Sequence, residues 1–183
     1  NRAVEQTKQI ILEKNVTTEN IDETAHDVGV GAVVFNELSN YRIKDYVFSW
    51  DKVLNFEGET GPYVQYTHAR ACSILRRAGE DTVKGAKKGF DTSWITGESA
   101  HHLIKLLYAL PEVIKEAGEK YEPSIVTRHI VDIAQGFNKF YHDEHILVED
   151  EKEKTAKVAL VLAVQTAIKN GLGLLGMKAP EKM

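Results

Sequence analysis

Apolar side chains recur every three or four residues along most of this chain, the spacing that places them on one face of an α-helix. Between Val158 and Ile168 nearly every residue is apolar, a pattern typical of a helix enclosed by other helices. No segment shows the strict alternation of apolar and polar residues that marks a half-buried strand. The pattern predicts an all-α helical bundle with helices over residues 1–14, 19–38, 62–78, 98–118, 123–142 and 151–175.

Some boundaries and connections can be predicted as well. Asn15 is expected to close the first helix, and Pro111 is expected to kink the fourth helix or divide it in two. Residues 39–61 lack a helical period and are predicted to form an ordered loop with a short helix near 51–54, while the polar, glycine-bearing residues 79–93 are predicted to form a mobile loop. The apolar stripe expected to face the core in the fourth helix consists of Leu103, Ile104, Leu107 and Leu110.

Length and composition narrow the class of protein. The chain has 183 residues, 43% of them hydrophobic, enough to form a core of its own. Its apolar runs are too short and too often interrupted by charge for a membrane span, and no signal peptide opens it. The single cysteine, Cys72, excludes an internal disulfide framework and fits a reducing compartment. We therefore expect a cytoplasmic protein with no membrane partner, in which Cys72 is a core or boundary thiol.

Motifs of phosphate-binding loops, dinucleotide folds and nucleophile elbows do not occur in the sequence. His142, Asp143, Glu144 and His145 could suggest a metal site, but no Cys and His set with zinc spacing accompanies them. A polar helix end is the simpler interpretation of these four residues, so no metal is expected.

The net charge of −4 is unevenly distributed. Residues 61–90 carry six basic and two acidic side chains, whereas the segments on either side are both acidic. Phosphate groups would be tolerated best beside this basic segment. A solvated helix end and a lysine-rich loop would give the same count. The basic residues, proposed as phosphate contacts, are Arg70, Arg76, Arg77, Lys84, Lys87 and Lys88.

The same segment starts with a helix that has an unusual polar face. Pro62 can open a helix, and Tyr63, Tyr66 and Arg70 then recur at spacings of three and four, on one face. Two rings and a guanidinium on one stripe suit an unpaired RNA segment, because bases stack on rings and arginine binds phosphate. By pattern alone, half-buried tyrosines beside a solvated arginine are the commoner arrangement.

Three blocks of sequence resemble the arginyl-tRNA synthetase family. TGPYVQYTHAR at 60–70, preceded by KDYVFSWDKVLNFEGE at 44–59, resembles the family's junction between the catalytic and anticodon-binding domains. EPSIVTRHIVDIAQGFNKFYHDEHIL at 122–147 and KTAKVALVLAVQTAIKNGLGLLGMKAPEKM at 154–183 resemble its later helices. The closing helix departs from the family's usual Arg-Leu pair, since this chain has Lys157 and Val158, which implies a structural role or a loose phosphate contact there.

The resemblance implies a fold, a partner and a site. Residues 61–183 would form the anticodon-binding bundle known as the DALR domain, and residues 1–60 a helical connector from the catalytic region. The partners would be tRNA(Arg) and the catalytic domain, not DNA. For the three blocks to form one site, the C-terminal tail would have to fold back beside the helix at Pro62. The implied anticodon-binding residues are Tyr63, Gln65, Tyr66, Arg70, Tyr141 and Met183.

The resemblance also implies what this chain would not do alone. The family's HIGH and KMSK-type motifs are absent, so the chain holds no catalytic residue and needs no cofactor itself, although the parent arginine–tRNA ligase uses ATP and Mg²⁺. Two other interpretations are a helical adaptor whose aromatic stripe binds a partner helix, and a domain-joining elbow with both tyrosines buried. Exposure of Tyr63 and Tyr66 would distinguish them.

Overall fold

The computed structural model describes residues 2–13 and 20–183. These residues form helices and connecting segments without any strand, which confirms the all-α prediction. The elements are α1 (Arg2–Glu13), α2 (Ile21–Ser39), α3 (Trp50–Val53), α4 (Gly61–Ala78), α5 (Glu80–Lys88), the 3₁₀-helix η1 (Thr92–Trp94), α6 (Glu98–Lys120), α7 (Ser124–Asp143) and α8 (Glu151–Leu174).

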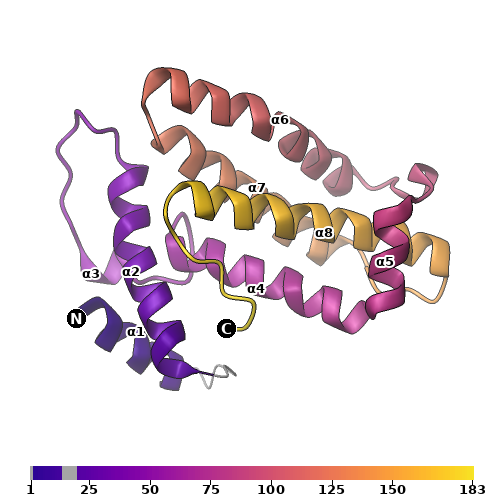
Figure 1. Cartoon of the computed structure of the whole chain (residues 1–183), viewed down its shortest axis with the longest axis horizontal. Helices are drawn as coiled ribbons and strands as arrows, with labels where there is room; N and C mark the ends of the chain where they lie inside the picture. Colours follow the sequence, from indigo (N-terminus) through magenta and orange to yellow (C-terminus); the bar gives the residue numbers. More distant parts are fainter. Residues whose placement is uncertain (1, 14–19) are drawn as a thin grey trace.

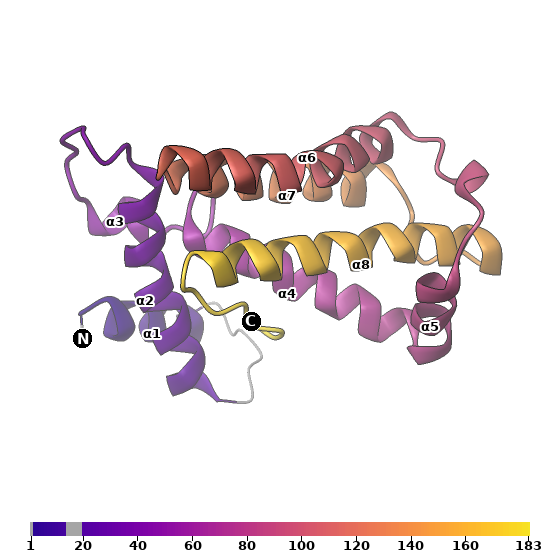
Figure 2. The ribbon, with the colours of Figure 1, turned by 45° about the horizontal axis from the view of Figure 1, so that its top comes forward.

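Four long helices make the bundle. Figure 1 shows α4, α6, α7 and α8 lying roughly along one another, and Figure 2 shows the α6–α7 pair above the α4–α8 pair. The apolar helix α8 packs against α4, α5, α6, α7 and η1, and Val158, Val161, Val164 and Ile168 are fully buried. The prediction of a central last helix is therefore confirmed.

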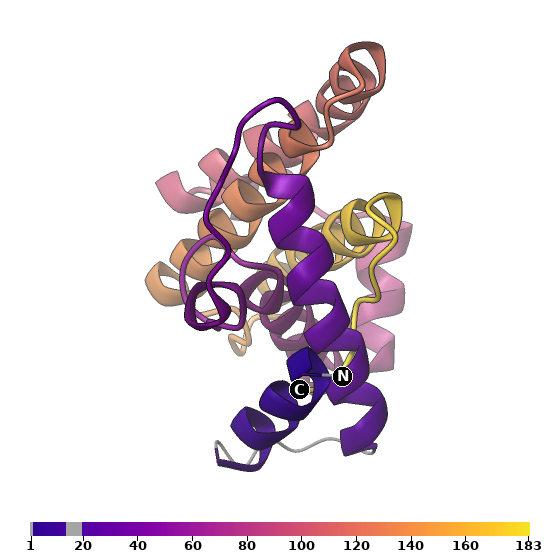
Figure 3. The same ribbon diagram turned by 90° about the vertical axis from the view of Figure 1, so that its left-hand side faces the viewer.

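The first three helices lie across one end of the bundle, which faces the viewer in Figure 3. Asn20 starts α2, because its side chain accepts a hydrogen bond from Glu23 N at 3.2 Å. α2 packs against α1, α3, α4 and α7, and so links this end to the bundle. The predicted closure of the first helix at Asn15 lies outside the described residues. No helix in the described part of the chain is both long enough and apolar enough to cross a membrane.

The prediction of a mobile loop over residues 79–93 is wrong. α5 and η1 occupy most of this segment. Ala86 is buried in the main core and α5 packs against α8, so a few small apolar residues are enough to fold it. Gly79, at φ +86°, lies between α4 and α5 and lets the chain turn from one to the other.

Helix α6, predicted over residues 98–118, also differs from its prediction. α6 continues through Pro111 to Lys120 without a break. Leu103 and Leu110 face the core as expected, but Ile104 is 38% exposed and is not part of the buried stripe.

Candidate nucleic-acid interface

The helix that carries the predicted tyrosines begins as the sequence predicts. The Thr60 hydroxyl oxygen accepts a hydrogen bond from Tyr63 N at 3.2 Å, and Pro62 occupies the first turn, where its missing N–H is not needed. A Cβ at Gly61 would lie 2.8 Å from the Cβ of Phe35 on α2, so the two helices can approach this closely only at a glycine. The start of α4 is therefore fixed against α2.

The tail, residues 175–183, folds back beside α4 as the resemblance requires (Figures 1 and 2). This brings Met183 to Tyr66 and Arg70, with which it lines the same hollows. Three side chains of α4 lie at hydrogen-bond distance from carbonyl oxygens of the tail: Gln65 from Lys178 (2.9 Å), His68 from Pro180 (2.9 Å) and Arg76 from Glu181 (3.1 Å).

Tyr66, Arg70, Tyr141 and Met183 form one surface, which we call the tyrosine face. The Arg70 guanidinium carbon lies 5.0 Å from the ring centre of Tyr66 and 5.7 Å from that of Tyr141. The two tyrosines are 37% and 42% exposed, and Tyr63 beside them is half-buried. The face therefore presents two rings and a cation to solvent, which is not the arrangement of a buried elbow.

Three hollows meet at Tyr66 and Arg70. The largest, about 770 Å³, extends toward the end of α7 and is also lined by Arg77 and Tyr141. A second, of about 650 Å³, extends toward α1, and a third, of about 420 Å³, lies between α4 and the tail; Met183 lines both. The arrangement offers separate spaces to unstacked bases around a single arginine.

Gln65 does not belong to this accessible surface. It is 0% exposed, and besides the tail its Nε2 donates to the main-chain oxygen of Asp27 on α2 at 3.2 Å. The anticodon contact that the resemblance implies for Gln65 does not fit this buried position. Its amide instead joins α4 to α2 and to Lys178 of the tail that ends at Met183.

The predicted phosphate contacts fall into two groups. Arg77 is exposed and lines the largest hollow, whereas Arg76 is bonded to the tail. Lys84, Lys87 and Lys88 are on α5, beyond the end of α4 (Figure 1), and none of them lines the three hollows. Only the two arginines lie next to the tyrosine face.

Lys157, at the position where the sequence departs from the family pattern, is 8% exposed. Its Nζ lies 2.8 Å from carboxylate oxygens of both Glu144 and Glu153, and donates to His145 O at 3.0 Å. Burial lowers the pKa of Lys157, but the hydrogen bonds to the two glutamates raise it more, so its net pKa is above the ordinary value. Lys157 therefore stabilises the junction of α7 and α8.

The polar end of α7 is held by ion pairs. Asp143 accepts a hydrogen bond from Lys139 at 2.9 Å, and Glu144 is paired with Lys157. Within residues 2–13 and 20–183, no group of three or more His, Cys, Asp and Glu side chains is arranged to hold a metal ion.

The sequence interpretation missed Asn138, on α7. Its Oδ1 accepts from Arg70 Nη1 at 2.7 Å and its Nδ2 donates to the Tyr63 hydroxyl at 2.9 Å. The sequence does hold a sign of its role: Asn138 lies in FNKFY, three residues before Tyr141, and this spacing puts both side chains on one side of α7.

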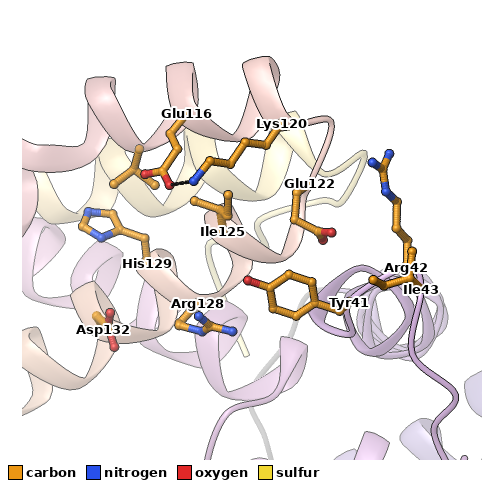
Figure 4. A pocket seen from close by; sticks show the side chains of 11 residues that line it. Tyr41, Arg42, Ile43, Glu116, Lys120, Glu122, Ile125, Arg128, His129 and Asp132 are labelled. Atoms are coloured by element: carbon orange, nitrogen blue, oxygen red, sulfur yellow. Dashed lines mark hydrogen bonds and ion pairs between the residues drawn. The ribbon is translucent and has the colours of Figure 1, made fainter.

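A further hollow, of about 480 Å³, lies between the loop after α2 and helices α6 and α7 (Figure 4). Arg42 at its edge donates to Tyr121 O at 3.0 Å, and Lys120 pairs with Glu116 at 2.6 Å. Arg128 and Asp132 add one charge of each sign to its walls. Because the charges are mixed, this hollow does not attract phosphate as a basic site would.

The fold and the tyrosine face define a helical domain of the anticodon-binding class, and the comparisons agree. The family described as "DALR anticodon binding domain" matches residues 64–183, and "tRNA synthetases class I (R), catalytic domain" matches residues 1–50. The chain belongs to the DALR anticodon-binding domain family. Nothing in these comparisons supports the adaptor interpretation.

Relatives point to one member of that class. The chain is 54% identical to the arginine–tRNA ligase of Halothermothrix orenii and 51% identical to that of Clostridioides difficile. Both alignments cover 100% of this chain and 32% of the relative. It superposes on the arginyl-tRNA synthetase of Thermus thermophilus with a TM-score of 0.90 at 33% identity, covering 100% of this chain and 31% of that one. The chain thus spans about a third of the length of these proteins.

Proposed function

We propose that this chain is the anticodon-recognition part of an arginine–tRNA ligase and binds the anticodon loop of tRNA(Arg). The observation that carries the proposal is the convergence of Tyr66, Arg70, Tyr141 and Met183, from three separate blocks of sequence, on one exposed face. Three hollows around one arginine suit bases that are unstacked from a loop, and sequence-specific RNA recognition targets such bases.

Each residue has a distinct part in the proposal. Tyr66 and Tyr141 stack on bases, a contact that contributes about 1–3 kcal/mol per base in other single-strand complexes. Arg70 lies between them and binds a phosphate or a base edge with the N–H groups that Asn138 does not use. Met183 supplies an apolar wall, and Arg77 binds phosphate at the rim of the largest hollow.

The remaining predictions belong to the same proposal. Lys84, Lys87 and Lys88 would meet phosphates away from the anticodon, because α5 lies beyond the end of α4.

Residues 1–60 would connect to the catalytic region and residues 61–183 would form the anticodon-binding bundle, a boundary supported by the gap between the two family matches. Aminoacylation, with ATP and Mg²⁺, would require the catalytic domain and takes place in the cytoplasm.

The proposal is tested by titrating the chain with tRNA(Arg) and with a tRNA for another amino acid at equal salt, since phosphate contacts make all affinities salt-dependent. We expect tighter binding of tRNA(Arg) and a loss of that preference in Tyr66→Ala. Tyr108→Ala is the matched control, because Tyr108 is 87% exposed on α6 and lines none of the three hollows. Equal affinity for both tRNAs would contradict the proposal.

A further inference from the structure

Asn138 contacts three side chains of α4 through a single amide group. Its Oδ1 lies 2.7 Å from Arg70 Nη1, and its Nδ2 lies 2.9 Å from the Tyr63 hydroxyl and 3.3 Å from Thr67 Oγ1. Two of the three partners, Tyr63 and Arg70, belong to the proposed RNA-binding set. The chemistry of this group determines how they can bind a ligand.

The orientation of the Asn138 amide follows from its partner. A guanidinium has only hydrogen-bond donors, so the atom of Asn138 that faces Arg70 must be the acceptor, Oδ1. The NH₂ group therefore faces Tyr63 and Thr67, and the opposite assignment of the amide would place N–H against N–H.

The direction of the Tyr63 hydroxyl proton follows in turn. Nδ2 of Asn138 can only donate, so the Tyr63 oxygen accepts. The Thr67 hydroxyl donates to Tyr63 O at 2.9 Å, and its oxygen accepts from Asn138 at 3.3 Å. Among the hydrogen bonds of the described residues, none gives the Tyr63 hydroxyl proton an acceptor.

Tyr63 lines the hollow of about 650 Å³, whose other walls are the apolar Ile10, Ile11, Phe56 and Met183 and the polar Glu57, Tyr66, Arg70 and Asn138. Glu57 is exposed, and no hydrogen bond of the described residues joins its carboxylate to the Tyr63 hydroxyl, so the proton stays available to a ligand in the hollow. We propose that Tyr63 donates a hydrogen bond to an acceptor atom of a nucleobase in this hollow, and that Asn138 is a positioning residue, which donates to the hydroxyl oxygen and offers its proton no acceptor. The inference rests on the proposed function and adds the chemistry of one subsite: a carbonyl oxygen or an unprotonated ring nitrogen.

A double-mutant cycle with Tyr63→Phe and Asn138→Asp tests this inference. The aspartate keeps one oxygen toward Arg70 and replaces the NH₂ group by a second oxygen, which can only accept. The Tyr63 hydroxyl would then donate to the carboxylate and lose its proton for the base. The added negative charge is present in both variants that contain Asn138→Asp, so its repulsion of RNA cancels in the cycle.

The measured quantity is the dissociation constant of the chain for tRNA(Arg) at fixed salt. We expect Tyr63→Phe to weaken binding about two- to tenfold in the wild-type background, the effect of one hydrogen bond, and to leave binding unchanged in the Asn138→Asp background. The same loss in both backgrounds, or no loss in the wild type, would overturn the inference. Asn138→Ala leaves the hydroxyl proton free, so Tyr63→Phe should still weaken binding there.

The cycle separates this inference from the proposed function. If the wild-type chain binds both tRNAs equally, the proposed function fails and the subsite fails with it. If it prefers tRNA(Arg) and the cycle is additive, only the role of Asn138 fails.

A second measurement serves if Asn138→Asp fails to fold, as a thermal melt would show. The tyrosine Raman doublet, taken from a wild-type minus Tyr63→Phe difference spectrum, reports whether the Tyr63 hydroxyl donates or accepts hydrogen bonds. A doublet typical of a hydroxyl that only donates, with no hydrogen bond accepted from Asn138, would overturn the inference.

Discussion

The Nδ1 atom of His68 lies 2.9 Å from the carbonyl oxygen of Pro180, and this contact joins α4 to the tail across 112 positions of sequence. The other ring nitrogen, Nε2, lies 3.0 Å from Nε2 of Gln165, which can only donate. Nε2 of His68 must then accept, and Nδ1 must carry the proton that it donates to Pro180. The tail that carries Met183 is therefore bound by a neutral, buried histidine.

This geometry predicts a specific loss of stability in acid. Burial lowers the pKa of His68 below 6.5, and the hydrogen bond to Pro180 and the charge of Glu181 only partly oppose it. The unfolded chain therefore takes up the proton at higher pH than the folded chain. The contribution of His68 is complete above about pH 6.5 and declines as the pH falls from there toward the lower pKa of the folded state.

Urea unfolding at pH 7.5 and pH 5.5 measures this effect. We expect the free energy of unfolding to fall less between these two values in His68→Gln than in the wild type, since the six other histidines are the same in both proteins. An equal fall in the two proteins would show that His68 is not held neutral.

Gln65 offers a test of the role that the structure gives it. Gln65→Leu removes the donor to both Asp27 O and Lys178 O and leaves two carbonyl oxygens without it, which should lower the free energy of unfolding by about 1–3 kcal/mol. Gln9→Leu, at an exposed position of α1, should change it by no more than about 0.5 kcal/mol. Equal stability of Gln65→Leu and the wild type in urea unfolding would show that these hydrogen bonds do not hold α2 and the tail to α4.

Lys157 should matter for stability and not for RNA. Lys157→Met leaves the carboxylates of Glu144 and Glu153 without their shared partner, and we expect a loss of about 1–3 kcal/mol in urea unfolding because both glutamates keep some contact with water. Lys84→Met, which breaks an exposed pair, should cost about 0.5 kcal/mol or less. A changed preference between tRNAs in folded Lys157→Met would mean that this lysine also contacts RNA.

Cys72 should be unreactive in the folded chain. Burial raises the pKa of its thiol to about 11, from an ordinary value of 9.0. The thiolate is the reactive form, so at pH 8 its fraction, and with it the rate of reaction with a disulfide reagent, should be about a hundredfold below that of an unperturbed thiol. Reaction at the rate of free cysteine without prior unfolding would contradict the buried position beside His68.

Periodicity was a sufficient guide to the long helices, because each buries one apolar stripe against α8 or its neighbours. It failed at residues 79–93, where α5 depends on the burial of Ala86 against an element far along the chain. The resemblance was a poor guide at Gln65, which shares a motif with exposed residues but bonds Asp27 and Lys178. Asn138 was missed for a related reason, since its importance comes from Arg70 and Tyr63, 68 and 75 residues away.

The central claim is that the tyrosine face recognises an anticodon. The most direct measurement compares the dissociation constants of the chain for two tRNAs that share one body and differ only in the anticodon, at a single salt concentration. We expect tighter binding of the tRNA with the arginine anticodon, and loss of the difference in Tyr66→Ala. Equal affinities in the wild-type chain would contradict it.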